Sequence, residues 1–303
     1  MLGGLGNRIG KFGGWAQRRA KRFAALERKV AALERLGQGS RATYVGNNRV
    51  LVGAVVGTHN IAYYVDADDR LISPWFITTG AYETSLTNFF LRELKIDSHC
   101  LDIGSNFGYF ACLFARLALE GRVLAVEADQ RVYALCRDNL SINGFHERAR
   151  AIHAAASNSI EPLTLYRRVG RPGNTSIVNI DTSFTDYMAE PPVEPFEVAS
   201  VRVDDLAEEF GGRVDFLKID VEGAEPLVLS GAERVIEQNP DLNLVMEWSP
   251  GQIRAAGFDV GDFLSHIDAL KLRPSVIMED GVEATGRDAL LGASYHTGIL
   301  LRR

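Results

Sequence analysis

The sequence has few cysteines and no long apolar run, and both shortages limit what the protein can be. Its 303 residues include three cysteines, Cys100, Cys112 and Cys136, an odd number without the spacing of a disulfide framework or a zinc site. No run of 18 apolar residues occurs, which predicts that no helix spans a membrane. The basic, glycine-rich start also lacks the apolar stretch of a secretory signal. We therefore expect reduced core thiols and a cytoplasmic protein.

The charged residues are distributed unevenly along the chain. The formal net charge is −6, yet residues 1–41 contain ten Lys and Arg against two Glu, leaving 23 basic and 37 acidic residues in the remainder. An acidic body binds nucleic acid poorly, so we expect no nucleic-acid partner. The basic N-terminal segment is the only part suited to an anionic surface.

Residues 1–38 form that basic segment, and its most regular helical pattern covers residues 18–36. Apolar residues recur seven apart, but fewer than three clean heptads are short for an independent coiled coil. Two interpretations stay open. The helix could join copies of the chain into a homo-oligomer, and its basic face could contact the inner face of an anionic membrane peripherally. Alternatively, it packs on its own domain.

Residues 39–96 predict a β-rich lead-in or cap subdomain. Residues 50–56 and 61–65 are runs of β-branched and aromatic residues, as is typical of strands. Another apolar run, residues 71–77, belongs to the same lead-in, and residues 84–94 predict a helix. We expect this subdomain to lean over the mouth of the ligand site.

Residues 97–303 alternate between short apolar runs and helical patterns, which predicts a parallel, doubly wound α/β sheet. Helices are expected at residues 109–119 and 129–142. The expected strands of this sheet are residues 99–103, 122–126, 149–153, 214–219, 242–246, 275–278 and 298–301.

A charged glycine turn joins the first of these strands to its helix. Gly104 and Gly108 allow close approach of a ligand, at the edge where open α/β sheets bind ligands. The spacing differs from the dinucleotide fingerprint, because Asn106 stands where that fingerprint has its middle glycine. Asp102 would repel a phosphate but attract the ammonium and sulfonium of S-adenosyl-L-methionine. An ordinary turn without a ligand is the alternative.

Acidic residues end the other strands of the expected sheet. Glu127 lies near the offset at which an acid grips ribose hydroxyls. Asp220 and Glu222 flank Val221, so one could face the cofactor and the other the acceptor, although either could instead cap the following helix. Glu247 ends a further strand. Ala154 to Ala156 offer a smooth wall for adenine or simply tight packing.

These motifs resemble those of the FkbM family of methyltransferases, with the likeness running from about residue 60 to 250. Ala128 is a departure, since the family usually has proline there, but the ribose contact comes from Glu127. The pieces that carry the resemblance are Asp102-Ile103-Gly104-Ser105-Asn106-Phe107-Gly108, Val126-Glu127-Ala128-Asp129, Leu217-Lys218-Ile219-Asp220-Val221-Glu222-Gly223-Ala224-Glu225, Gly80-Ala81-Tyr82-Glu83, Asn139 and Asn143.

The resemblance implies a class I methyltransferase sheet of seven mostly parallel strands, and methyl transfer from S-adenosyl-L-methionine to a hydroxyl, commonly on a sugar, glycan or natural product. It also implies roles for individual residues. The cofactor-binding set is Glu83, Asp102, Gly104, Asn106, Gly108, Glu127, Ala128, Ala155 and Asp220.

A hydroxyl needs a base as it attacks a methyl carbon, and Asp220 or Glu222 is the expected catalytic residue. A divalent cation held by these carboxylates is an alternative that two acids alone do not favour. Two other hypotheses stay open: a nicotinamide-dependent enzyme acting on nucleotide sugars, and a non-catalytic coiled-coil scaffold with a relic pocket.

Overall fold

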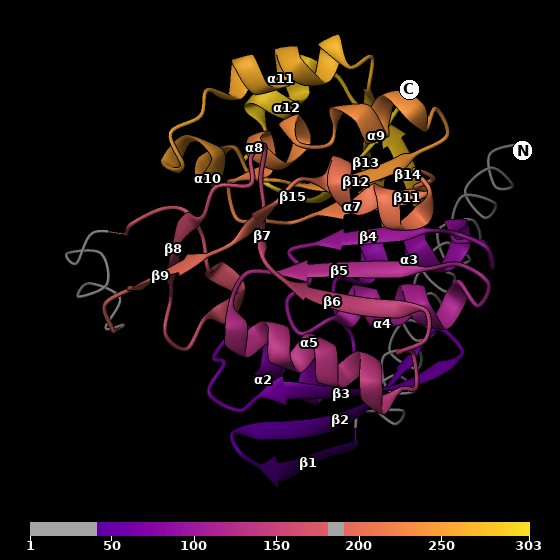
Figure 1. Cartoon of the computed structure of the whole chain (residues 1–303), viewed down its shortest axis with the longest axis vertical. Helices are drawn as coiled ribbons and strands as arrows, with labels where there is room; N and C mark the ends of the chain where they lie inside the picture. Colours follow the sequence, from indigo (N-terminus) through magenta and orange to yellow (C-terminus); the bar gives the residue numbers. More distant parts are fainter. Residues whose placement is uncertain (1–40, 181–190) are drawn as a thin grey trace, which may run out of the picture.

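The computed structural model describes residues 41–180 and 191–303 (Figure 1). The expected basic helix of residues 1–38, with its regular stretch at 18–36, lies outside the described residues. Its proposed roles in self-association and in membrane contact therefore stay predictions. Within the described ranges, no helix is both long and apolar enough to cross a membrane.

The centre of the molecule is a mixed sheet whose middle strands run parallel, in the order β14-β13-β15-β12-β11-β4-β5-β6. β14 and β15 run opposite to the other six strands of this sheet. The seven expected strands are all present, and a hairpin partner, β14, adds an eighth at one edge. The strands are β4 (Cys100–Ile103), β5 (Val123–Glu127), β6 (Ala149–His153), β11 (Phe216–Ile219), β12 (Asn243–Trp248), β13 (Arg273–Met278), β14 (Gly281–Ala284) and β15 (His296–Arg302).

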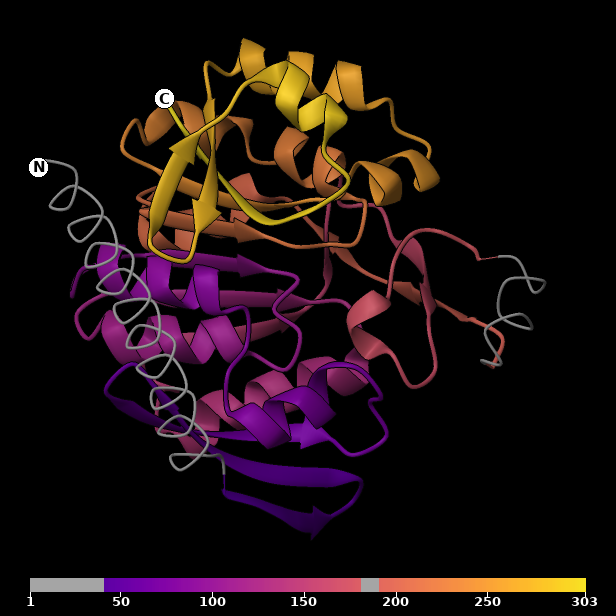
Figure 2. The ribbon, with the colours of Figure 1, turned by 180° about the vertical axis from the view of Figure 1, so that it is seen from behind.

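Helices cover both faces of this sheet, as Figures 1 and 2 show from opposite sides. Side chains alternate along β4, so Leu101 and Ile103 enter one apolar core while Cys100 enters the other. One face carries α3 (Thr84–Glu93), α4 (Tyr109–Leu117) and α5 (Gln130–Ile142); the other carries α7 (Val203–Leu206), α8 (Glu225–Ser230), α9 (Glu233–Gln238), α10 (Pro250–Ala255), α11 (Val260–Ala269) and α12 (Arg287–Gly292). All three cysteines are buried and free.

The lead-in begins with an antiparallel meander, β1 (Arg41–Gly46), β2 (Arg49–Val56) and β3 (His59–Asp66). It packs beneath α4 and α5 (Figure 1), and its inward residues join the core of that sheet face. The meander therefore buries its apolar side against helices. The part of the lead-in that reaches the ligand cavity comes after β3.

One element of the lead-in was given no secondary structure from the sequence: the apolar run at residues 71–77 is helical. It forms α2 (Ile72–Thr79). The Asp69 carboxylate accepts hydrogen bonds from the backbone N–H groups of Leu71, Ile72 and Ser73 at 2.6–3.1 Å. These N–H groups have no partner within the helix, so Asp69 stabilises the first turn. The run is too short for its hydrophobic periodicity to predict a helix.

Two asparagines fasten the meander to α5. Asn139 is fully buried, accepts from Tyr64 N–H at 2.5 Å and donates to the carbonyls of Tyr64 and Phe107 at 2.9 and 2.7 Å. Asn143 forms the equivalent pair of bonds with Ala62, at 3.0 and 2.7 Å. Each amide therefore satisfies both backbone groups of a β3 residue, as a neighbouring strand would.

Candidate active site

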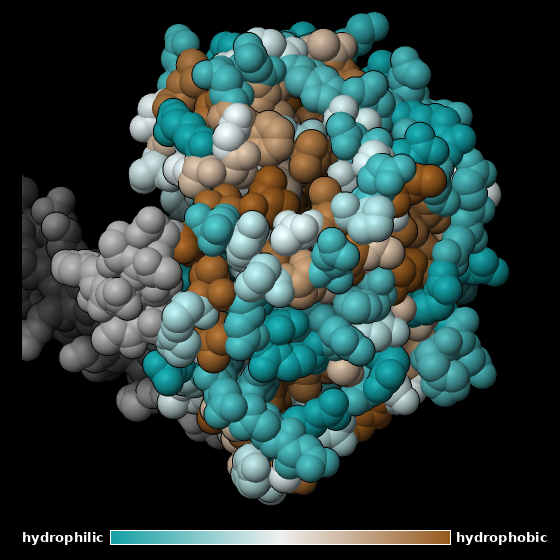
Figure 3. All heavy atoms as spheres, turned by 60° about the vertical axis from the view of Figure 1, so that its left-hand side comes forward, coloured by the Kyte–Doolittle hydropathy of each residue, from teal (hydrophilic) through white to brown (hydrophobic). Residues whose placement is uncertain are grey.

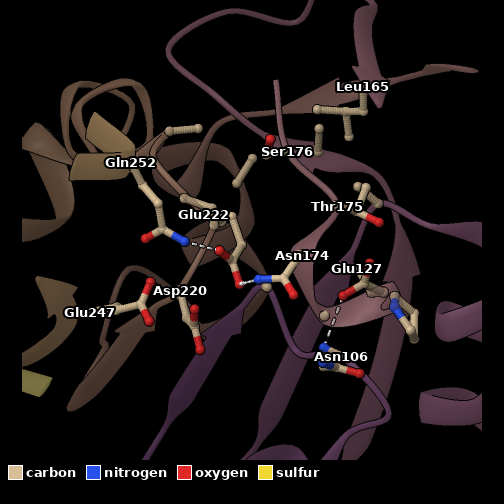
Figure 4. Close-up of a pocket in the computed structure, with 18 of the residues that line it drawn as sticks. Asn106, Glu127, Leu165, Asn174, Thr175, Ser176, Asp220, Glu222, Glu247 and Gln252 are labelled. Atoms are coloured by element: carbon tan, nitrogen blue, oxygen red, sulfur yellow. Dashed lines mark hydrogen bonds between the residues drawn. The ribbon is translucent and has the colours of Figure 1, made fainter. Parts of the chain in front are cut away.

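A cavity of about 320 Å³ opens at the carboxyl ends of β4, β5, β11 and β12 (Figure 4). Figure 3 turns this edge of the sheet forward and shows hydrophobic residues gathered among hydrophilic ones. The lead-in closes one side of the cavity with Leu71, Ile72 and Glu83. The segment after β8 (Leu163–Arg167), including a short 3-10 helix (Pro172–Asn174), closes another side.

The glycine turn lies at the centre of this edge. Gly104 has φ +74°, and a Cβ there would lie 1.7 Å from the backbone oxygen of Asp220. Only glycine allows β4 and β11 to end so close together. Gly108 also has positive φ and packs against Cys136, but it is not among the residues that line the cavity.

Unusual backbone conformations gather around the cavity. Six non-glycine residues within the described ranges have positive φ, and three of them, Glu83, Asn106 and Glu222, line it. Such conformations cost of order 1–3 kcal/mol each and persist where surrounding structure holds them, often at functional sites. Glu83, Asn106 and Glu222 come from three different segments, so this clustering is a property of the cavity.

Glu127 lies at the end of β5 and is 9% exposed. Its carboxylate accepts hydrogen bonds from Asn106 N–H at 2.9 Å and Asp129 N–H at 2.8 Å. Burial raises the pKa of Glu127 to about 7, against the lowering effect of these bonds. The two N–H groups fix the orientation of the carboxylate, which still has lone pairs facing the cavity.

Small side chains form the wall beside Glu127. Ala128, Ala154, Ala155 and Ala156 line the cavity, together with two leucines of β8. β8 pairs with β9 (Glu194–Val198), and β7 (Ala155–Ala156) pairs with β10 (Ser200–Val201). Arg167 of β8 bonds to Asp129, the N-cap of α5, and lies 4.8 Å from the Phe196 ring centre. This ion pair holds the β8–β9 hairpin against the wall.

Asp102 is fully buried below the cavity and is not among its lining residues. Its Oδ1 lies 3.9 Å from Nζ of Lys218, and neither carboxylate oxygen has a hydrogen-bond partner within the described residues. Burial raises the pKa of Asp102 to about 6, although Lys218 opposes that shift. Asp102 can therefore influence a ligand through its charge and through Lys218, but it does not face the cavity directly.

Three carboxyl groups meet at the opposite end from Glu127. Asp220 follows β11, Glu222 lies in the next turn, and Glu247 ends β12; one oxygen of each lies within 4.8 Å of the others. Glu222 accepts hydrogen bonds from the amides of Gln252 and Asn174, as Figure 4 shows. Such a group could hold a cation or receive hydrogen bonds from an acceptor.

The environment of Glu222 and Glu247 disfavours their charged forms. Burial, then Asp220, raises the pKa of Glu222 to about 8 and that of Glu247 to about 10. Glu83 rises to a pKa of about 8 for the same two reasons, and its Oε2 has no hydrogen-bond partner within the described residues. Perturbed carboxyl pKa values in one cleft are typical of functional sites.

Four residues of the site were given no functional role by the sequence analysis. Lys218 stands in the recognised motif but was given no role there, and Glu247 was noted only as a strand end. Tyr295 donates to Glu247 at 2.9 Å, and Gln252 bonds to Glu222. No local pattern marks Tyr295 or Gln252, because both reach the cavity through tertiary packing.

The comparison with family profiles identifies the catalytic domain. The profile of the methyltransferase FkbM domain matches residues 102–272. The chain belongs to the FkbM methyltransferase family. Its doubly wound, mostly parallel sheet is the class I methyltransferase fold expected for that family. This FkbM protein is also similar to methyltransferase sdnD of Sordaria araneosa, with 29% identity over 202 residues, covering 55% of this chain and 76% of that protein.

Two solved methyltransferase structures are among those that this chain matches. The TehB-like SAM-dependent methyltransferase from Corynebacterium glutamicum has 12% identity and a TM-score of 0.41, with 76% of this FkbM chain and 95% of that chain covered. The O-methyltransferase from Bacillus cereus in complex with SAH has 12% identity and a TM-score of 0.39, with 72% and 79% covered.

Proposed function

We propose that this methyltransferase takes its methyl group from S-adenosyl-L-methionine and transfers it to a hydroxyl of a sugar, glycan or natural product. The observation that carries the proposal is the division of one cavity into two chemically different ends. Gly104, Glu127 and the alanine wall form one end, and the carboxyl groups of Asp220, Glu222 and Glu247 form the other. The first end suits a nucleoside, and the second suits a polar acceptor.

The residues at the first end fit the donor. The glycine turn lets β4 and β11 end close together at the cavity, and Glu127 can accept hydrogen bonds from ribose hydroxyls. Ala155 and its neighbours can lie flat against an adenine. Glu83 carries an unpartnered buried oxygen beside the cavity, which suits the ammonium of a methionine portion.

The residues at the second end can prepare a hydroxyl for attack. When bound, S-adenosyl-L-methionine supplies an electrophilic methyl group, so the protein has to orient the acceptor oxygen and exclude water. Asp220 or Glu222 can accept the hydroxyl proton as the new bond forms. Asn174, Gln252 and Tyr295 border the same end and can hold the rest of a hydroxyl-rich acceptor.

A divalent cation at the three carboxyls is not part of this proposal. Asp220 already bonds to Lys218, and both oxygens of Glu222 accept bonds from amides. Dialysis against a chelator should therefore leave methyl transfer intact. If the chelator abolished methyl transfer and added magnesium restored it, a divalent cation at these carboxyl groups would be part of the mechanism.

Calorimetric titration tests the choice of donor. We expect S-adenosylhomocysteine to bind and NAD not to bind, because Glu127 and the glycine turn suit a nucleoside without a diphosphate. Glu127→Gln should weaken binding by about tenfold or more, given that one charge-assisted pair contributes about 1.5–3 kcal/mol. Glu161→Gln, at an exposed position, is the matched control. Binding of NAD in preference to S-adenosylhomocysteine would refute the proposal.

Screening identifies the acceptor. Sugars, glycans and hydroxylated natural products are incubated with the protein and a donor labelled in its methyl group. The expected product carries an acid-stable, base-stable methyl ether. Transfer confined to amines or thiols would contradict the hydroxyl acceptor while leaving the donor assignment intact.

A further inference from the structure

Lys218 is a buried cation that the proposed chemistry has not yet used. It lies in β11 between Asp102 of β4 and Val245 of β12 and is 3% exposed. A buried ammonium is costly unless it is paired with a charge and hydrogen-bonded. Its position one residue before the strand end brings its charge directly below the acidic end of the cavity.

The contacts of Lys218 favour one carboxyl over the others. Its Nζ donates to Oδ2 of Asp220 at 3.0 Å, lies 3.9 Å from Oδ1 of Asp102, and is 5.1 Å from the ring centre of Phe110. Burial alone would lower the pKa of Lys218, but Asp220, Asp102 and Glu83 together raise it. The lysine is therefore charged, and the only hydrogen bond of its ammonium group within the described residues goes to Asp220.

The other two carboxyls have neutral hydrogen-bond partners. Glu222 accepts from the amides of Gln252 and Asn174, and Glu247 accepts from the Tyr295 hydroxyl. Arg168 exerts an opposing electrostatic effect on Glu222, smaller than those of burial and of Asp220. Neutral donors orient a carboxyl without requiring that it be ionised.

We propose that Lys218 is a positioning residue that keeps Asp220 anionic and oriented, so that Asp220 rather than Glu222 or Glu247 takes the acceptor proton. This inference rests on the proposed function and resolves the choice of base that the sequence left open. Glu222 and Glu247 then bind the acceptor through hydrogen bonds.

The proton has a defined destination in this arrangement. Oδ2 of Asp220 is bonded to Lys218, which leaves Oδ1 for the hydroxyl. As the oxygen–carbon bond forms and the carbon–sulfur bond breaks, the hydroxyl proton passes to Oδ1 of Asp220 and the sulfur keeps the bonding electron pair. The proton then leaves to water. The Asp220 carboxylate is thereby restored.

Two donor analogues measure the charge at this point without an acceptor. S-adenosylhomocysteine has a neutral sulfur, whereas sinefungin carries an ammonium where the methylsulfonium would be. The ratio of their dissociation constants, measured by calorimetry, reports the negative charge facing that position. We expect the wild-type protein to bind sinefungin more tightly. Failure of the wild-type protein to bind either analogue would overturn the proposed donor, and with it this inference.

The variants then separate the three carboxyls. Asp220→Asn should reduce the preference for sinefungin by about tenfold, equivalent to about 1.4 kcal/mol, and Glu222→Gln and Glu247→Gln should each reduce it less. Lys218→Met should reduce the preference at pH 7, because the Asp220 carboxylate then lacks the charged partner that orients it. Lys95→Met, at an exposed lysine, is the matched control.

Several results would overturn the proposal. If Glu222→Gln or Glu247→Gln reduced the preference for sinefungin more than Asp220→Asn does, the anionic carboxylate would be Glu222 or Glu247 and not Asp220. If Lys218→Met bound sinefungin at pH 7 with the same preference as the wild-type protein, the lysine would contribute to packing alone. If Lys218→Met fails to fold in thermal unfolding, Lys218→Arg replaces it. Lys218→Arg should keep most of the preference because it keeps the charge, and loss of the preference there would also contradict the proposal.

Discussion

The protein buries polar groups in two regions, and it treats them differently. At the seam between α5 and β3, Asn139 and Asn143 have their side-chain oxygens and nitrogens paired with backbone groups. At the cavity, buried oxygens of Glu83 and Glu247 have no partner within the described residues. The polar side chains of the seam find their hydrogen-bond partners within the chain. The unpaired carboxyl oxygens of the cavity can gain partners when a ligand binds.

This difference separates polar groups that stabilise the fold from polar groups that serve function. An unsatisfied buried oxygen costs stability, so its persistence at the carboxyl ends of the strands needs a reason other than folding. A bound donor with positive charge provides that reason. The seam, in contrast, fastens the lead-in to the catalytic domain without any ligand.

The largest effect is expected at the seam. Asn139→Ala removes three hydrogen bonds at a fully buried position and leaves backbone groups of Tyr64 and Phe107 unpaired. We expect the free energy of unfolding to fall by about 3 kcal/mol, at about 1–3 kcal/mol per unsatisfied group. Denaturant titration measures it, with Asn60→Ala at an exposed position of β3 as control. Equal stability of the two variants would remove the structural role of the seam.

At the cavity, in contrast, we expect a substitution to increase the free energy of unfolding. Glu247→Gln keeps an oxygen for Tyr295 but removes a carboxyl group whose pKa is raised to about 10. The free energy of unfolding at pH 8 should therefore rise, by about 1 kcal/mol or more, while methyl transfer falls. Glu237→Gln, on the exposed side of α9, should change neither. A destabilised Glu247→Gln would show that this carboxyl contributes to folding as the asparagines do.

The pH dependence of stability tests the buried carboxyl groups together. Carboxyl groups whose folded-state pKa lies above the unfolded value favour folding at low pH, and that benefit is lost as the pH rises through the folded pKa. We expect the melting temperature without ligand to fall between pH 6 and pH 9, and S-adenosylhomocysteine to offset part of the fall. A melting temperature that increases over this range would contradict the pKa shifts. The groups concerned are Asp102, Glu127, Glu225, Glu83 and Glu222, with pKa values of about 6, 7, 7, 8 and 8, together with Glu247.

Local patterns predicted most of the catalytic sheet. The expected strand at residues 149–153 matches β6, and the expected helix at 129–142 differs from α5 by one residue. Buried parallel strands are short apolar runs between helical patterns, so their positions can be read directly. The helix α2 was missed because the hydrogen bonds from the next few N–H groups to Asp69, which stabilise its first turn, leave no mark in the hydrophobic periodicity.

The site was predictable where it follows strand ends and not where distant segments contribute. Glu127, Asp220 and Glu222 line the cavity because topology alone brings strand ends to one edge. Asp102 was expected beside the ligand, but the alternation of side chains along β4 turns it inward towards Lys218. Tyr295 lies 48 positions from its partner Glu247, a distance over which a single sequence gives no contact information.

A crystal structure grown with S-adenosylhomocysteine tests the central claim most directly. The account predicts that its ribose hydroxyls bond to Glu127, its adenine lies against Ala155, and its sulfur points towards the end that contains Asp220. An empty cavity, or a ligand bound with its ribose away from Glu127, would contradict the account.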